Sequence, residues 1–207
     1  MLSATLSVVL PYWLDRPALE AIDIARSAAF LGYSELWVGE MMTFDAFALA
    51  AAIVRETETM RVVVGPLAIG VRSPAALALG IASVSELGGR RAGLALGAST
   101  PLVVEGWHGQ SFEQPVERMR EVVEALRPML AGEKSAFAGK LAASRGFRLA
   151  ATPPHSTIGI AAFGPKMLGL AARIADGVVV NLVTPAQVAR TKEAIRVGNA
   201  RRLFKLS

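Results

Sequence analysis

The sequence predicts an α/β protein made of repeated strand–helix units around a parallel sheet. Short apolar runs rich in β-branched residues alternate with amphipathic stretches of helical length along the 207 residues. Glycine-bearing segments lie where these strands and helices are expected to meet, at 64–67, 96–99, 163–166 and 175–178. Strands that alternate with helices of this length pair in parallel through right-handed crossovers. Barrel enzymes build their sites at such strand-to-helix corners.

The first three units are regular. Strands are predicted at 5–10, 35–38 and 61–69, and helices at 17–31, 45–55 and 74–87. Asp15 is expected to cap the first helix and Ser73 the third, in which Pro74 takes the first helical position. Asp45 is interpreted as the cap of the second helix and not as a catalyst.

The second half repeats the alternation with one interruption. A strand at 91–96 leads into a longer loop and then a helix at 114–131, while 134–149 breaks into short runs that predict an inserted hairpin. Strands at 157–162 and 177–180 alternate with helices at 165–174 and 185–198, and Asp176 is expected to fix the turn into the last strand. The helix at 114–131 is expected to bury Met119, Val122, Val123, Leu126, Met129 and Leu130, and to expose Arg118, Arg120, Glu121 and Glu124.

Length and composition indicate one folded domain over 1–207. A hydrophobic content of 53% excludes a disordered chain. The sequence holds no apolar run near the roughly 18 residues that span a bilayer, and its first residues lack a basic region, so we expect a soluble cytoplasmic protein with no membrane partner. The absence of cysteine excludes disulfides and thiolate metal sites, and two histidines make a metal centre unexpected.

Charge and motifs exclude several functions. The net charge is +5, but basic and acidic residues are interspersed, so nucleic acid is not an expected partner, whereas a small phosphate-bearing ligand would suit this balance. The basic tail, with Arg196, Arg201, Arg202 and Lys205, is interpreted as a solvated helix end. Phosphate-loop, nucleophile-elbow and dinucleotide glycine motifs are absent from the sequence, which argues against a kinase, an esterase and a classical NAD dehydrogenase. Six units suit an open doubly wound sheet, whereas a closed barrel has eight units and about 250 residues, so counting alone leaves both architectures open.

Several motifs in order along residues 1–198 resemble the luciferase-like superfamily of flavin and deazaflavin oxidoreductases, in particular its coenzyme F420-dependent branch. They are GE (39–40), GPLAIG (65–70), RSP (72–74), LALGAS (94–99), EGWHG (105–109), AAFGPK (161–166) and ADGVVVN (175–181). The resemblance implies a TIM-type (β/α) barrel with the cofactor at the C-terminal ends of the strands. The barrel is expected to be incomplete, with about six of eight units, because the last two have no counterpart in this sequence.

The resemblance also implies which residues contact the cofactor ring. After the third strand, relatives form a bulge, often with a non-proline cis peptide, that presses on the central ring. An ordinary strand end is the alternative at that place, and a tight turn without ligand is the alternative after the fourth strand. The implied ring contacts are Leu67, Ala68, Ile69, Gly97, Ala98, Ser99, Val103 and Val104.

The cofactor's side chain is expected at the fifth strand-to-helix corner. Free N–H groups, a helix dipole and the Lys166 cation suit a phosphate or carboxylate there, although a glycine–proline helix start is also common without any ligand. The implied contacts are Ala162, Gly164, Pro165, Lys166, Asn181 and Thr184.

Three residues are candidates for moving a proton. Glu40 matches an acidic position of some relatives, but Met41 stands where those relatives carry a catalytic histidine. Glu105 and His108 are the other candidates, and His108 has the more suitable intrinsic pKa. His155 is interpreted as a surface residue.

Two classes of function follow. The first is an oxidoreductase that passes a hydride between coenzyme F420 and a small organic substrate, with an FMN-dependent monooxygenase as its chemical variant. The second is a shortened, non-catalytic relative that binds ligand weakly. Because two missing units would leave sheet edges exposed, a homodimer is also expected.

Overall fold

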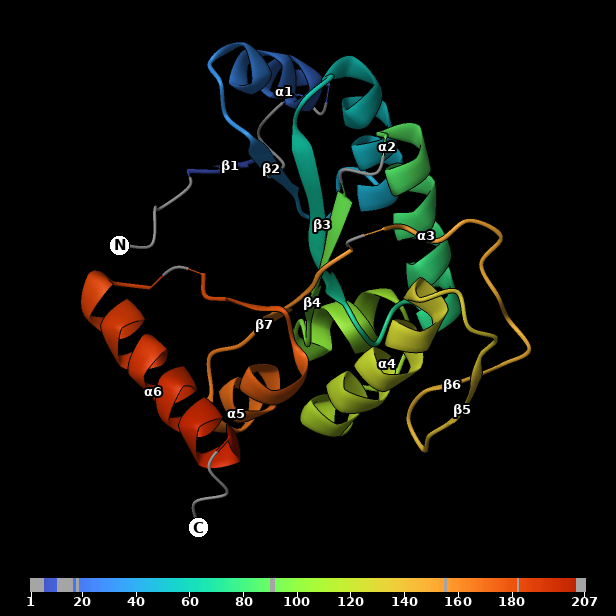
Figure 1. Ribbon diagram of the computed structural model, residues 1–207, viewed down its shortest axis with the longest axis vertical. Helices are drawn as coiled ribbons and strands as arrows, with labels where there is room; N and C mark the ends of the chain where they lie inside the picture. The colour runs from blue at the N-terminus through green and yellow to red at the C-terminus, as the bar shows by residue number, and fades with distance from the viewer. Residues whose placement is uncertain are drawn as a thin grey trace.

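The protein, seen here in a computed structural model, is built on a single curled sheet of six parallel strands (Figure 1). The structure describes residues 6–10, 17, 19–89, 92–154, 156–181 and 183–203, with the backbone alone for residues 194 and 196–203. The strands in spatial order are β1 (Val8–Val9), β2 (Glu35–Val38), β3 (Arg61–Ala68), β4 (Ala92–Gly97), β7 (Ile158–Ala161) and β8 (Gly177–Val179).

Helices follow the strands, and the first five of them contribute buried residues to the core that packs on the sheet. They are α1 (Glu20–Phe30), α2 (Ala46–Glu56), α3 (Pro74–Leu87), α4 (Pro115–Leu130), α5 (Pro165–Ile174) and α6 (Pro185–Leu203). Two further features interrupt the alternation, a π-helix η1 (Leu102–Trp107) after β4 and a hairpin of β5 (Ala136–Ala138) and β6 (Ala143–Arg145) after α4. The predicted α/β class and the insertion hairpin are therefore present.

The order of the strands decides between the two architectures that counting left open. Each new strand of the main sheet is added beside the previous one in chain order, from β1 to β8. An open doubly wound sheet reverses its strand order at a switch point, whereas a barrel does not. The sheet is consequently an incomplete TIM-type barrel, as predicted.

The predicted helix caps at Asp45 and Ser73 are confirmed. The Asp45 carboxylate accepts a hydrogen bond from the Ala48 N–H at 3.0 Å, and the Ser73 hydroxyl accepts one from Ala76 N–H at 3.2 Å. Asp176 also acts as predicted, because its carboxylate accepts from Ile158 N–H at 2.7 Å and so joins the start of β7 to the turn before β8.

Other boundaries differ from the predictions. β1 has two residues instead of six, and α1 begins at Glu20 after Leu19, which provides no side-chain cap. Asp15 and His155, for which roles were predicted, and Arg91, the first residue of the predicted strand 91–96, lie outside the described residues. The helix α6 ends at Leu203, five residues later than expected, and the predicted loop after β4 contains a π-helix.

The prediction for the buried face of α4 is correct in part. Met119, Val122, Val123, Leu126 and Met129 are buried as expected, whereas Leu130 is only half-buried. The prediction that Glu121 faces water is wrong, since its side chain is 3% exposed. The β5–β6 hairpin covers it, and its carboxylate accepts hydrogen bonds from Lys140 N–H at 3.0 Å, Leu141 N–H at 2.6 Å and Ala142 N–H at 2.7 Å.

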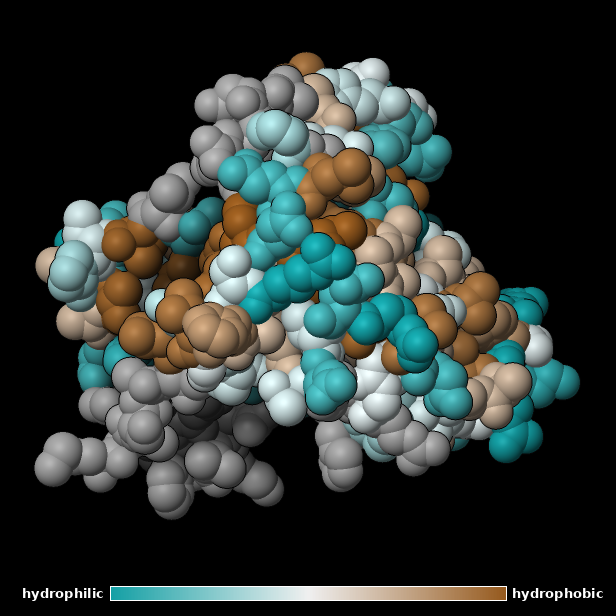
Figure 2. Space-filling view, turned by 90° about the horizontal axis from the view of Figure 1, so that it is seen from above, coloured by the Kyte–Doolittle hydropathy of each residue, from teal (hydrophilic) through white to brown (hydrophobic). Residues whose placement is uncertain are grey.

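Polar side chains join the strands at their amino ends. Glu35 accepts from the Ser7 hydroxyl at 3.0 Å and from the Trp37 indole at 2.9 Å, and it pairs with Arg61, which also donates to Thr157 at 2.6 Å. Seen from above, hydrophilic side chains cross the middle of the molecule's face, and hydrophobic side chains border a recess beside them (Figure 2). Within the described residues no helix is both long and apolar enough to cross a membrane.

Candidate functional site

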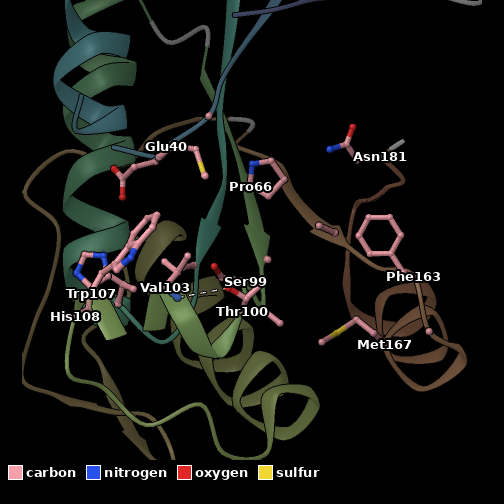
Figure 3. A pocket seen from close by; sticks show the side chains of 18 residues that line it. Glu40, Pro66, Ser99, Thr100, Val103, Trp107, His108, Phe163, Met167 and Asn181 are labelled. Atoms are coloured by element: carbon pink, nitrogen blue, oxygen red, sulfur yellow. Dashed lines mark hydrogen bonds between the residues drawn. The ribbon is translucent and has the colours of Figure 1, made fainter. Parts of the chain in front are cut away.

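A hollow of about 490 Å³ opens where β2, β3, β4 and β7 end (Figure 3). Its strand side consists of small residues, namely Gly39, Pro66, Ala68, Gly97 and Ala161. In a strand every second residue faces the same side, so Gly39 shares its face with Trp37, Gly97 with Ala95, and Ala161 with Gly159. The volume lies within the range typical of ligand sites.

Gly97 leaves space on this floor where another residue would carry a side chain. A Cβ at residue 97 would lie 3.3 Å from Pro66 Cβ and 3.7 Å from Ala161 Cβ, so a longer side chain would extend from this floor into the hollow. Backbone and small side chains of three neighbouring strands therefore form one surface. A planar ring can approach such a surface closely.

The strand β3 bulges beside this floor, which agrees with the bulge that the family resemblance implies and not with an ordinary strand end. Its pairing with β4 shifts between Val64 and Leu67, and Gly65 has a φ of 128°. A Cβ at Gly65 would lie 2.2 Å from the Ala95 carbonyl oxygen, so only glycine fits. The cis peptide bond is Gly65–Pro66, which is an X–Pro bond and precedes the expected position.

The three predicted ring contacts after β3 do not all reach the hollow. Ala68 lines it together with Pro66, which the predicted set did not include. Leu67 and Ile69 are buried in the core on the other face of the strand. Alternation along the strand explains the difference, because Ala68 points inward and its two neighbours point outward.

The segment after β4 carries most of the polar lining. Ala98, Ser99 and Thr100 line the hollow, and Ser99 has a left-handed φ of 63°, a conformation that is uncommon for residues other than glycine and concentrates at functional sites. The Thr100 hydroxyl accepts from Val103 N–H at 3.4 Å at the start of η1.

The π-helix η1 brings Trp107 and His108 to the mouth of the hollow, opposite Phe163 and Met167 (Figure 3). Of the two predicted valines, Val103 lines the hollow. Val104 is instead buried, and a Cβ at Gly70 would lie 2.8 Å from its Cγ1, so Val104 anchors η1 against the turn after β3. Such π-helical turns are frequent at functional sites.

Glu40 lines the hollow as a carboxylate that is already bound. Arg72 pairs with both of its oxygens, with a 2.7 Å bond to Oε2, and the Ala46 N–H donates to the same oxygen at 2.8 Å. Arg72 also pairs with Asp45 and lies 5.5 Å from the centre of the Phe47 ring. The hydrogen bond with Glu40 raises the pKa of Arg72 above its ordinary value. Glu40 is thus an anchored anion at the junction of β2, β3 and α2.

The other two proton-transfer candidates occupy different positions. His108 lines the hollow. The Glu105 carboxylate is not among the lining groups and accepts from Phe112 N–H at 3.2 Å, so it holds the loop that follows η1.

The residues predicted to contact the cofactor's side chain lie partly in the hollow and partly around it. Gly164 and Asn181 line it, whereas Ala162 is buried in the core. Pro165 and Lys166 form the first turn of α5, and Thr184 and Gln187 cap the start of α6 reciprocally, with 2.7 and 3.3 Å bonds.

Sequence reasoning missed most of the large apolar lining. Met41, Trp107, Phe163 and Met167 belong to it, together with Val71. Met41, Phe163 and Trp107 lie within or next to motifs that the sequence analysis had singled out. Position at a strand-to-helix corner would have found Met41 and Phe163, which follow β2 and β7 within three residues.

Comparison with known proteins supplies an independent line of evidence. A model of the luciferase-like monooxygenase family matches residues 8–203. A Mycobacterium tuberculosis protein, provisionally named a coenzyme F420-dependent oxidoreductase, is 29% identical over an alignment of 213 positions. The alignment covers 95% of this chain and 60% of that protein. The 5,10-methylenetetrahydromethanopterin reductase of Archaeoglobus fulgidus is 32% identical over 174 residues, or 82% of this chain and 51% of the enzyme.

A solved structure has the same fold. The coenzyme F420-dependent tetrahydromethanopterin reductase of Methanopyrus kandleri superposes with a TM-score of 0.84 at 20% identity, over 96% of this chain and 62% of that chain. The chain thus spans between one half and two thirds of the length of these similar proteins.

Proposed function

Because the chain belongs to the luciferase-like monooxygenase family, we propose that it binds coenzyme F420 and exchanges a hydride with a small organic substrate. The observation that carries this proposal is the floor of the hollow. Gly97, Pro66 and Ala161 line it together, and the missing Cβ at Gly97, which would lie 3.3 Å from Pro66 Cβ and 3.7 Å from Ala161 Cβ, leaves room there for a ligand. A planar three-ring system fits such a surface, and two relatives carry F420-linked names.

The corner after β7 fits the anionic side chain of that coenzyme. Among the described residues no side chain caps α5 at Gly164, so the first N–H groups of this ten-residue helix can donate to a ligand. A Cβ at Gly164 would meet no atom within 4 Å, which leaves room for a phosphate. Lys166 in the first turn adds a positive charge.

Coenzyme F420 supplies the carbon that gives or receives the hydride, and the protein's residues position the reactants. The floor of small residues holds the ring plane, and Trp107 and Phe163 shield the mouth of the hollow from water. His108 is placed to give or take the one proton at the substrate. Glu40, bound by Arg72, fixes the corner between β2 and α2 and is a positioning residue.

The test is a fluorescence titration of the purified chain with F420 and, separately, with FMN. We expect saturable binding of F420 with a micromolar dissociation constant and weaker binding of FMN. Preference for FMN would favour a flavin-dependent monooxygenase. Binding of F420 without turnover of any carbonyl or alcohol would favour a non-catalytic relative, and binding of neither would refute the proposal.

We also propose that the chain forms homodimers through the outer face of α3. Leu79 and Leu87 are exposed on this helix, and no charged residue occurs between Pro74 and Ser85. A two-fold dimer places a surface against its own copy, so the uncharged stretch 74–85 avoids like-charge contacts, and the exposed Glu86 carries the charge at the end of the helix. Sedimentation should give a dimer for the wild type and a monomer for Leu79→Glu, whereas Leu19→Glu, at an exposed residue before α1, should leave the dimer intact.

A further inference from the structure

Large apolar side chains from three separate segments surround the open side of the hollow. Met41 follows β2, Trp107 ends η1 and Phe163 follows β7, and their exposed fractions are 44%, 40% and 63%. Trp107 and Phe163 lie on opposite sides of the hollow (Figure 3). Exposed apolar groups converging on one recess mark a binding surface for apolar matter.

The charges around the hollow also indicate an uncharged ligand. Of the described residues that line it, none is a lysine or an arginine. Its one carboxylate, Glu40, is already paired with Arg72, and the same guanidinium also pairs with Asp45, so the lining offers an anionic substrate no free counter-charge. Burying a charge without a partner is expensive.

Neutral hydrogen-bonding groups remain. Ser99 and Thr100 follow β4, Asn181 follows β8, and His108 stands at the mouth. Hydroxyl, amide and imidazole groups can donate to a carbonyl oxygen or accept from a hydroxyl without a compensating charge. Two or three such groups suffice to orient one polar function of an otherwise apolar ligand.

We propose that the substrate side of the site selects uncharged, largely apolar molecules that carry one neutral oxygen function, and rejects carboxylates and phosphates. This inference rests on the proposed function, because it assigns the strand-built floor to the coenzyme ring and the loop-built mouth to the substrate. Met41 is its main determinant, since it stands beside the bound Glu40 at the mouth.

The experiment compares two probes of nearly equal shape, 4-phenylbutan-2-one and 3-phenylpropanoate, which differ by a methyl group against a charged oxygen. Saturation-transfer NMR and tryptophan fluorescence measure their binding to the full chain without coenzyme. We expect the ketone to bind at least about tenfold more tightly, a difference of roughly 1.4 kcal/mol. Equal or tighter binding of the carboxylate, or no ketone binding at millimolar concentration, would overturn the inference.

A pair of variants tests the role of Met41 in this selectivity. Met41→Lys puts a cation at the mouth and should lower the ketone preference at least about tenfold. Met42→Lys changes an adjacent residue that is 52% exposed and does not line the hollow, so the preference should stay at the wild-type value. Circular dichroism checks that both variants fold, and an unchanged preference in folded Met41→Lys would count against the proposal. The F420 titration of the same samples reports separately on the proposed function.

Discussion

Replacing Glu121 by glutamine should loosen the β5–β6 hairpin from the rest of the protein. The Glu121 carboxylate is 3% exposed and accepts three backbone hydrogen bonds, from Lys140, Leu141 and Ala142. A hydrogen bond to a charged group contributes about 1.5–3 kcal/mol. Glutamine keeps one carbonyl oxygen but turns an NH₂ donor toward backbone donors, so at least one bond is lost. We expect a loss of about 2–4 kcal/mol.

The sign of the pH dependence follows from the pKa of Glu121. Burial raises this pKa. The hydrogen bonds from Leu141, Ala142 and Lys140 and the positive charge of Arg120 together lower it by more. The pKa of Glu121 in the folded protein therefore lies below the ordinary glutamate value. A carboxylate whose pKa is depressed by folding contributes stability above its unfolded pKa of about 4.3, and this contribution is lost as the pH falls below that value. The difference in the free energy of unfolding between wild type and Glu121→Gln should therefore be largest at pH 7 and smaller at pH 3.

Urea denaturation gives the free energy of unfolding, and amide hydrogen exchange at Leu141 and Ala142 reports local opening of the hairpin. Glu124→Gln is the matched control, because Glu124 lies on the same helix, is exposed and pairs with Arg120. Exposed ion pairs contribute at most about 1 kcal/mol, so this variant should remain close to wild type. The reasoning fails if Glu121→Gln is within about 0.5 kcal/mol of wild type and its hairpin amides exchange no faster.

Four further outcomes are expected. Gly97→Leu should lower F420 affinity by at least about a hundredfold in a folded protein, because the side chain would enter the hollow from its floor; unchanged affinity in the titration would place the ring elsewhere. Arg72→Ala should cost about 1–3 kcal/mol in urea denaturation, since Glu40 would remain half-buried without its cation. Lys166→Ala should weaken F420 binding at low salt and much less at high salt. If the variant and the wild type bind F420 equally well at both salt concentrations, Lys166 does not belong to the site. His108→Gln should reduce turnover more than it changes F420 affinity, and turnover like that of the wild type would exclude the proton-transfer role.

The regular elements could be predicted because local patterns specify them. The helix caps Asp45 and Ser73, the strand 35–38 and the helix 165–174 all follow from periodicity and end residues within a few positions. The number of units did not decide the architecture. The pairing order of the strands did, and pairing is a long-range property that the periodicity of one chain does not contain.

Three features of the molecule escaped local reasoning for physical reasons. Glu121 looked solvated because a charge on a helix usually is, and its burial depends on a hairpin that packs on α4. The pairing of Arg72 with Glu40 joins residues 32 positions apart. The π-helix η1 depends on Val104 finding room beside Gly70, which a sequence pattern does not reveal.

The buried Glu121 is linked to the surroundings of the candidate site by hydrogen bonds and by one space that both border. Glu121 holds the hairpin turn, and the Leu141 carbonyl in that turn accepts from the Arg118 guanidinium at 3.1 Å. Arg118 and residues 141–143 face the turn 69–74, across a space of about 280 Å³, and this turn carries Arg72. Loosening the hairpin would admit water beside Arg72 and so weaken its attraction for Glu40, because the interaction of two charges falls as the local dielectric constant rises.

This connection makes a measurable claim about coupling. If the hairpin protects the Arg72–Glu40 pair, Glu121→Gln and Arg72→Lys should be non-additive in stability, with a coupling energy above about 0.5 kcal/mol, although the two residues lie on different elements. Additive effects would mean that the hairpin is an independent attachment. The same double-mutant cycle measured on turnover then separates the two roles of the insertion, since coupling in turnover without coupling in stability would place its influence on the catalytic geometry and not on the fold.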